Sequence, residues 1–326
     1  MRRREFIAVV GGAAIASAGS ARSQPSVNPV VGFVHARSRD DTLPLVAAFQ
    51  RGLAESGLIV GQNLAVEYRF ADGDYARLPA IISELVSRPV NVLVTGADPA
   101  AIAGKKAAGS VPMVFVVGGD PVALGLVSSM SRPGGNATGM TILTTSLEPK
   151  RIGLFREILP SNITVGALFN PKLPLSQKQA QAVQEAARAI NLKVQNFWIS
   201  NDAEMANAFN AILDQHVGAL LVAADPFFDT RRDALTGWTT QHKIPSIFQF
   251  RDYAVAGGLM SYGIDLPDVY RQIGVYTAHI LKGEKPSDLP VTEPTKFDFV
   301  INLKAAKLLG VTIPSGLMSI ADEVIE

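Results

Sequence analysis

Short apolar runs alternate with longer segments of helical periodicity along most of the chain, and this alternation constrains the fold more than any other feature. The runs have the length of a buried strand, and each segment between them can carry the chain back across a sheet as a helix. Such a pattern is typical of a parallel sheet covered by helices. The first series predicts strands at residues 30–34, 63–68, 90–94 and 111–117 and helices at residues 43–56, 75–87 and 99–108.

The same pattern starts again after residue 164. A chain of 326 residues exceeds what one compact core usually holds, so we predict two Rossmann-like α/β lobes, each built on a parallel sheet. The tail of the chain could return to the first lobe and then cross once more to the second. The second series predicts strands at 165–169, 193–198, 219–223 and 246–250 and helices at 177–190, 203–215 and 230–242, and the tail predicts a helix at 265–282, a strand at 297–302 and a helix at 304–309.

The first residues of the chain have the pattern of an export signal. Three arginines at 2–4 precede an uncharged stretch at 6–18, and Ala21 and Ser23 place small residues before a cleavage point at Gln24. The arginines fit a twin-arginine signal, and a Sec signal is the alternative. The chain has no cysteine to carry a lipid anchor, and no later stretch is long and apolar enough to span a membrane. We therefore expect a mature protein that resides in the periplasm and does not span the membrane.

Composition and motifs exclude several classes of function. Without cysteine there is no thiol catalysis or disulfide, and no two of the 4 histidines have metal-ligand spacing. A net charge of +1, with no basic block after residue 4, argues against nucleic acid as a partner. The glycines before Lys105 lack P-loop spacing, no dinucleotide-binding glycine motif follows the first strand, and Ser261 lacks the preceding glycine of a nucleophile elbow. We expect no enzymatic activity, no cofactor and no metal.

Ligands of open α/β sheets bind beyond the carboxyl ends of the strands. If two lobes face each other through these ends, the ligand lies in the cleft between them. The loops of interest follow Val34, Val94, Val117, Phe169, Ala223 and Phe250.

The loop after the third strand combines a polar stretch with the start of a helix. Thr95, Gly96 and Ala97 precede Asp98-Pro99, which is typical of a helix N-terminus. Free N–H groups and a partial positive charge at such an end suit a carboxylate. We expect Thr95, Gly96 and Ala97 to face a ligand, and Asp98 to cap the helix.

The loop after the fourth strand has a similar design. Gly118 and Gly119 would let a ligand approach the backbone closely, and Asp120 before Pro121 is a capping signal as well as a candidate contact.

Five further residues are candidate contacts. Asn170 and Asp225 follow strands of the second half, where Asp225 could pair with an amine or cap a turn. Phe227 could wall the pocket or belong to the core. Tyr262 lies in a glycine-rich stretch that could cross between the lobes as a hinge. His35 ends the first strand and faces the expected cleft.

Several stretches of the chain resemble the family of ABC-transporter substrate-binding proteins described as tryptophan/tyrosine-type. They are residues 119–127 (GDPVALGLV), 133–139 (PGGNATG), 301–306 (INLKAA), 309–314 (LGVTIP) and 321–325 (ADEVI). The resemblance implies a type I periplasmic-binding-protein fold with three crossings between lobes. It also implies a monomer that hands a small molecule to an ABC permease and its ATPase subunits. The lobes would then comprise residues 28–141 plus 252–286 and residues 142–251 plus 287–326, after an export signal at 1–23.

The same resemblance implies roles for the candidate residues. The loops at 95–97 and 118–120 would hold the carboxylate end of the ligand, and Asn170 and Asp225 would approach from the second lobe. Binders of aromatic amino acids in this family have an Asn after the matching aspartate, whereas this chain has Pro226. The expected ligand is therefore amino-acid-like, or an aromatic or branched carboxylate without an amine. The alternative functions are a ligand-sensing subunit for a membrane receptor and a secreted α/β enzyme.

Overall fold

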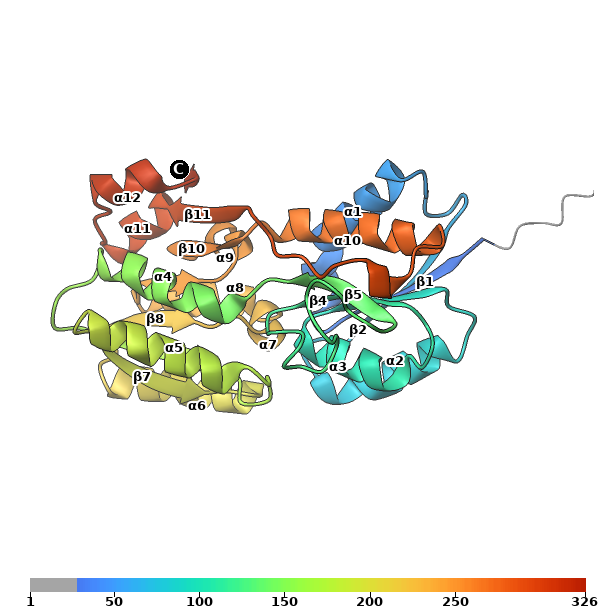
Figure 1. The fold of residues 1–326 in the computed structure, drawn as a ribbon. Helices are drawn as coiled ribbons and strands as arrows, with labels where there is room; N and C mark the ends of the chain where they lie inside the picture. The colour runs from blue at the N-terminus through green and yellow to red at the C-terminus, as the bar shows by residue number, and fades with distance from the viewer. Residues whose placement is uncertain (1–27) are drawn as a thin grey trace, which may run out of the picture.

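The computed structural model describes residues 28–326 and shows two α/β lobes side by side (Figure 1). The proposed export signal and its cleavage point lie outside the described residues. The first lobe contains a five-stranded, entirely parallel sheet in the order β2-β1-β3-β4-β5. Its central strands read as continuous apolar runs because helices bury both faces of the sheet. The strands are β1 (Val30–His35), β2 (Ala65–Phe70), β3 (Val92–Gly96), β4 (Met113–Val117) and β5 (Ala137–Thr141).

Helices cover both faces of the first sheet. One face packs against α1 and α10, the other against α2 and α3 (Figure 1). Helices α1 and α10 come from opposite ends of the chain and approach closely, because Gly52 and Gly274 leave no side chain between their backbones. The helices are α1 (Arg39–Glu55), α2 (Leu78–Val86), α3 (Asp98–Ala107) and α10 (Leu266–Leu281), with short 3-10 turns η1 (Tyr75–Arg77) and η2 (Pro286–Asp288).

The second lobe contains a seven-stranded sheet in the order β12-β11-β10-β9-β8-β6-β7. It is parallel except for the antiparallel pair of β10 and β11. Helices α4 and α5 pack on one face, while α6 and α8 pack on the other. The strands are β6 (Thr164–Phe169), β7 (Lys193–Trp198), β8 (Ala219–Val222), β9 (Ser246–Phe248), β10 (Met260–Ile264), β11 (Phe297–Asn302) and β12 (Glu323–Ile325). The helices are α4 (Thr144–Arg156), α5 (Ser176–Ala189), α6 (Asp202–Asp214), α7 (Pro226–Asp229), α8 (Arg232–Gln241), α9 (Arg251–Val255), α11 (Leu303–Leu309) and α12 (Ser315–Ile320).

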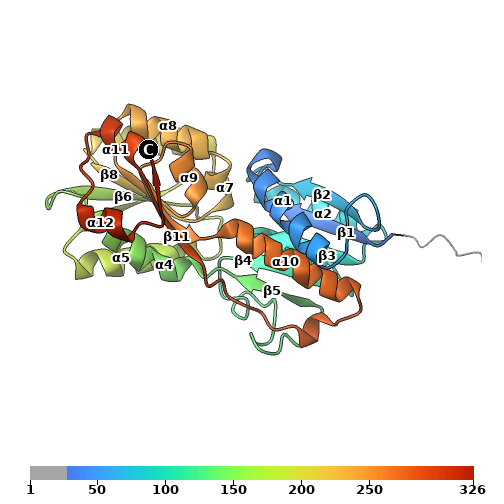
Figure 2. The ribbon, with the colours of Figure 1, turned by 90° about the horizontal axis from the view of Figure 1, so that it is seen from above.

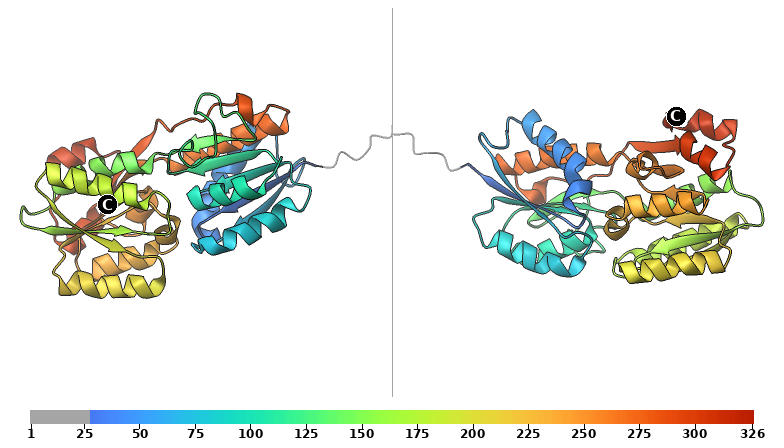
Figure 3. Two further views of the ribbon diagram at one scale, coloured as in Figure 1. Left: turned by 60° about the horizontal axis from the view of Figure 1, so that its bottom comes forward. Right: turned by 180° about the vertical axis from the view of Figure 1, so that it is seen from behind.

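Three segments cross between the lobes, between β5 and α4, between β10 and α10, and between η2 and β11 (Figures 2 and 3). Hydrogen bonds tie them together near the crossing. The N–H of Thr292 donates to Gly139 O (3.2 Å), Thr141 N–H donates to Thr292 O (3.0 Å), and Asp265 N–H donates to Lys296 O (3.2 Å). This arrangement confirms the prediction of two α/β lobes in a type I periplasmic-binding-protein fold.

The structure differs from the sequence-based division of the chain at the second crossing. The sequence predicts residues 252–264 in the first lobe, but β10 pairs with β9 and β11 inside the second sheet. The crossing follows β10, at Asp265. The glycine-rich stretch around Tyr262 is therefore a buried strand and not a free hinge. An added Cβ at Gly263 would overlap the carbonyl oxygen of Gln249, so this glycine serves close packing.

Two elements of the crossing region were not predicted. Strand β5 is short, and two of its five residues are threonines whose hydroxyls bond to Leu289 O (2.6 Å, from Thr138) and Gly119 O (2.8 Å, from Thr141). Helix α4 contains Pro149 and lacks a clear apolar period. In the part of the chain that the structure describes, we find no helix with the length and apolar character needed to cross a membrane.

Candidate ligand-binding cleft

A cavity lies between the two lobes. Its wall includes residues from all six loops that the strand ends predict, because the carboxyl ends of both parallel sheets face the cleft. In chain order these are His35 and Arg37, Ala97 and Asp98, Val117 and Gly118, Leu173 and Leu175, Ala224 to Pro226 with Asp229, and Phe250.

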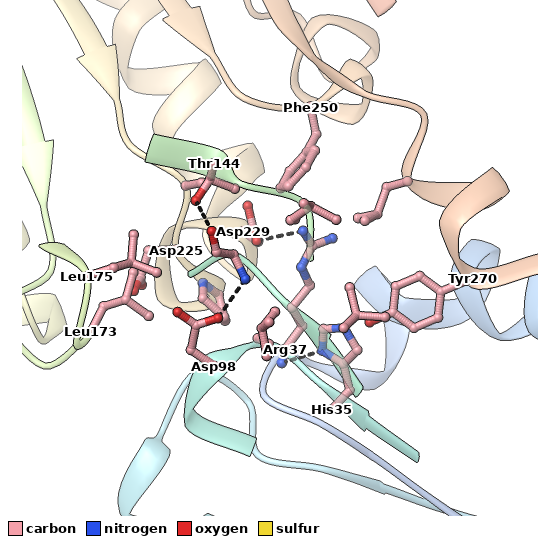
Figure 4. Close-up of a pocket in the computed structure, with 18 residues that line it drawn as sticks. His35, Arg37, Asp98, Thr144, Leu173, Leu175, Asp225, Asp229, Phe250 and Tyr270 are labelled. Atoms are coloured by element: carbon pink, nitrogen blue, oxygen red, sulfur yellow. Dashed lines mark hydrogen bonds and ion pairs between the residues drawn. The ribbon is translucent and has the colours of Figure 1, made fainter. Parts of the chain in front are cut away.

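An ion pair joins the lobes across this cavity. Arg37 Nη2, from the loop after β1, lies 2.7 Å from Asp229 Oδ2 at the end of α7, and both side chains are about 5% exposed or less. The other carboxylate oxygen of Asp229 accepts from Gln249 Nε2 (2.7 Å) and Tyr253 Oη (3.0 Å). The Arg37 guanidinium also lies over the Phe250 ring, 4.9 Å from its centroid. These contacts need closed lobes, since Arg37 belongs to the first lobe and its partners to the second (Figure 4).

A second interlobe contact is made by Asp225. Its Oδ1 accepts from Tyr75 Oη of the first lobe (2.7 Å), from Asn170 Nδ2 (3.0 Å) and from Phe227 N–H (2.8 Å). Its Oδ2 is buried without a hydrogen-bond partner among the described residues. Burial raises the pKa of this carboxyl to about 7, against the opposing effect of its three donors. Asp225 caps the N-terminus of α7, which is one of the two roles that the sequence predicts for it, and it also lines the cavity.

Asp98 does not act as the helix cap that the sequence predicted. It is the first residue of α3, and its side chain reaches across to the next loop. Its Oδ1 accepts from Gly118 N–H (2.6 Å) and Gly119 N–H (3.3 Å), while Oδ2 is buried with no partner in the described chain. Burial raises the pKa of Asp98 to about 6. The backbone donors expected to hold a ligand carboxylate therefore bind a carboxylate of the protein itself (Figure 4).

His35 lies on the floor of the cavity and is uncharged at neutral pH. Its Nδ1 accepts from the Arg37 N–H (3.0 Å), and burial together with the nearby Arg37 charge holds the pKa of the ring well below its ordinary value. The His35 ring packs against Tyr270 of α10, with ring centroids 5.8 Å apart. A Cβ at Gly96 would overlap the His35 ring, so Gly96 allows this packing.

The predicted contact residues divide into two groups. His35, Ala97, Gly118 and Asp225 line the cavity. The other seven do not line it. Thr95 and Gly96 lie behind the cavity in β3, and Gly119 and Asp120 line a neighbouring groove. Asn170 donates to Asp225 from the side away from the cavity. Phe227 is buried in the core beneath Arg231, and Tyr262 packs against Phe297 and Phe299.

Asp120 is exposed and accepts from Val122 N–H (2.8 Å) within its own turn, which fits its capping interpretation.

Sequence reasoning missed several residues of the cavity wall. Arg37 and Asp229 carry no motif, and only the fold brings them together. Two signals could have pointed to Phe250 and Tyr270, since Phe250 ends a predicted strand and Tyr270 lies near the start of the predicted tail helix. Within residues 28–326, no group of three or more His, Asp or Glu side chains is arranged to hold a metal ion.

Closure of the ligand-free cleft should depend on pH. The pKa values of Asp98 and Asp225 are raised in the closed form, to about 6 and about 7, so this form binds protons more tightly than a form with exposed carboxyls. Their contribution to closure is complete below about pH 4 and is lost as the pH rises through 6 to 7. We expect the radius of gyration from X-ray scattering to increase between pH 5 and pH 8. With Asp225→Asn, the upper part of this transition should disappear. A radius that falls with rising pH would contradict the expectation.

A family model described as ABC transporter substrate binding protein matches residues 29–325. A curated relative, the tyrosine-binding protein of Clostridioides difficile, is 26% identical over 80% of this chain and 75% of the relative. A conserved domain protein from Vibrio cholerae is 27% identical, covers 91% of this chain and 99% of its own, and has a TM-score of 0.84. An ABC domain from Streptococcus pneumonia in complex with L-Trp is 26% identical, covers 91% and 100%, and has a TM-score of 0.83. The chain belongs to the family of ABC transporter substrate binding proteins, which bind solutes and are not enzymes.

Proposed function

We propose that this protein captures a small amino-acid-like or aromatic solute in the periplasm and delivers it to an ABC permease and its ATPase subunits. The observation that carries the proposal is a cavity between two lobes whose buried contacts form only on closure. The predicted export signal supports a periplasmic location. The tyrosine- and L-Trp-binding relatives support the class of ligand.

Closure would couple binding to delivery. Three interlobe contacts support this mechanism, namely Arg37 with Asp229, Tyr75 with Asp225, and Arg232 with Asp41 at 3.1 Å. A ligand that binds one lobe and gains contacts to the other favours the closed form by its differential affinity. The permease can then distinguish loaded from empty protein by the relative position of the lobes.

The walls of the cavity suit a partly apolar ligand. Leu173 and Leu175 come from the second lobe, Ile142 lies in the crossing segment after β5, and Leu266 is the first residue of α10. Phe250 and Tyr270 add aromatic surface on the side of Arg37 and His35 (Figure 4). An aromatic or branched body would be buried here, and its polar end would lie toward Asp98 and Asp225.

A thermal-shift screen of the purified protein tests the proposal. The panel contains amino acids, aromatic and aliphatic amines, aromatic and branched carboxylates, purines and sugars. A ligand at 100 times its dissociation constant should stabilise the folded state by about 2.7 kcal/mol. We expect a compound with an aromatic or branched body to raise Tm by several degrees. A shift with sugars alone, or with no compound of the panel, would contradict the proposed ligand class.

A further inference from the structure

The charges around the cavity do not balance. Among the described residues that line the cavity, Arg37 carries the positive charge, and Asp229 at 2.7 Å neutralises it. His35 is uncharged because burial and the Arg37 charge lower its pKa. Two more carboxyls line the cavity, Asp98 from the first lobe and Asp225 from the second, and no side chain of opposite charge is paired with either.

Each of these two carboxyls has one satisfied and one unsatisfied oxygen. In both residues Oδ1 accepts two or three hydrogen bonds from the protein. In both, Oδ2 is buried with no partner among residues 28–326, and each residue is only 2% exposed. A buried carboxylate oxygen without a donor is strongly unfavourable, and an ammonium group of a ligand would supply donors and the missing charge.

A ligand carboxylate has a poorer environment here. The Gly118 and Gly119 N–H groups that would receive it donate to Asp98. A carboxylate would also add a negative charge to a cavity that already holds two unbalanced acidic groups. An amino acid brings one charge of each sign and leaves the imbalance unchanged, whereas an amine without a carboxylate reduces it.

Building on the proposed function, we propose that the cleft selects an organic amine with an apolar or aromatic body and no carboxylate. The ammonium group donates to the free oxygens that Asp98 and Asp225 present from opposite lobes. Because one anchor belongs to each lobe, a ligand that reaches both stabilises the closed form. Asp98 then acts as a specificity residue. Its side chain accepts the hydrogen bonds of the Gly118 and Gly119 N–H groups, so the ligand meets a carboxylate oxygen of Asp98 instead of these two donors.

The test uses three series of ligands. Within each series the apolar part of the molecule is the same and the charged groups differ. Isothermal titration calorimetry at pH 7.5 compares tryptamine with tryptophan and indole-3-propionate, tyramine with tyrosine and its propionate analogue, and isoamylamine with leucine and 4-methylpentanoate. We expect the amine to bind at least about 10-fold more tightly than the amino acid with the same body, and the acid to bind most weakly. Tighter binding of the amino acids or the acids would overturn the inference and leave the proposed function standing. No binding by any of the three series would overturn the aromatic or branched ligand class itself, and the inference with it.

Two variants separate recognition from folding. Asp98→Asn keeps an oxygen for Gly118 and Gly119 and turns the free acceptor into a donor, so amine affinity should fall about 10-fold to 100-fold. Asp98→Ser frees the two N–H groups, and preference should move toward the amino acid. Asp214→Asn, at an exposed carboxylate at the end of α6, is the matched control and should change neither affinity nor preference. An unchanged amine preference in both Asp98 variants, with unchanged Tm, would overturn the assignment of Asp98.

Discussion

Replacing Arg37 by Met is expected to weaken ligand binding about 100-fold while changing the Tm of the ligand-free protein little. The variant leaves Asp229 buried in the closed form without its counter-charge, and removing one partner of such a pair typically costs about 3–5 kcal/mol. The folded protein can avoid most of this cost by opening, which exposes Asp229 to water. The loss therefore falls on closure, and hence on affinity, because binding requires the closed form.

Titration calorimetry with the tightest ligand of the screen measures this effect. Arg251→Met is the matched control, since its ion pair with Glu323 lies within the second lobe and both side chains are well exposed, at 46% and 38%. Exposed pairs contribute about 1 kcal/mol or less, so this control should bind normally. The double variant Arg37→Met with Asp229→Leu should recover part of the affinity, because an apolar pair removes the isolated charge. Equal affinities for Arg37→Met and the control would show that the pair does not contribute to closure.

Replacing Gly52 by Ala is expected to have the largest effect on stability. A Cβ at this position would overlap the carbonyl oxygen of Arg271 in α10, and the Gly274 backbone lies just beyond it. Neither helix can move away easily, since both pack on the same face of the first sheet. Overpacking of this kind typically costs 1–3 kcal/mol and sometimes more, and we expect a loss of about 3 kcal/mol. In a protein of this size the fall in Tm should be about 5 °C.

Gly237→Ala provides the control for Gly52→Ala. Gly237 lies within α8, and an added Cβ there has no neighbour within 4 Å. Alanine is the better helix former, so this variant should stabilise the protein by roughly 0.5–1 kcal/mol. Both variants are compared by thermal and urea unfolding followed by circular dichroism. If Gly52→Ala unfolds at the same temperature as Gly237→Ala, the close approach of α1 and α10 is not tight.

The loops that form the cavity could be predicted from the sequence, and most of the predicted contact residues could not be placed in it. Parallel strands all end at one edge of a sheet, so a list of strand ends is also a list of loops at the cleft. Which side chain of a loop faces the cavity depends on local backbone geometry. Ala97, with a φ of 78°, lines the cavity, whereas Thr95 two residues earlier is buried in β3.

The sequence by itself determined the two α/β series and the family, because periodicity and short motifs are local properties. Only the tertiary structure decided that Arg37 pairs with Asp229, that β10 belongs to the second sheet, and that Asp98 takes the N–H groups of Gly118 and Gly119. These contacts join segments that lie far apart in the chain. Their energies depend on burial and on the donors that remain free, and both are properties of the closed, packed molecule.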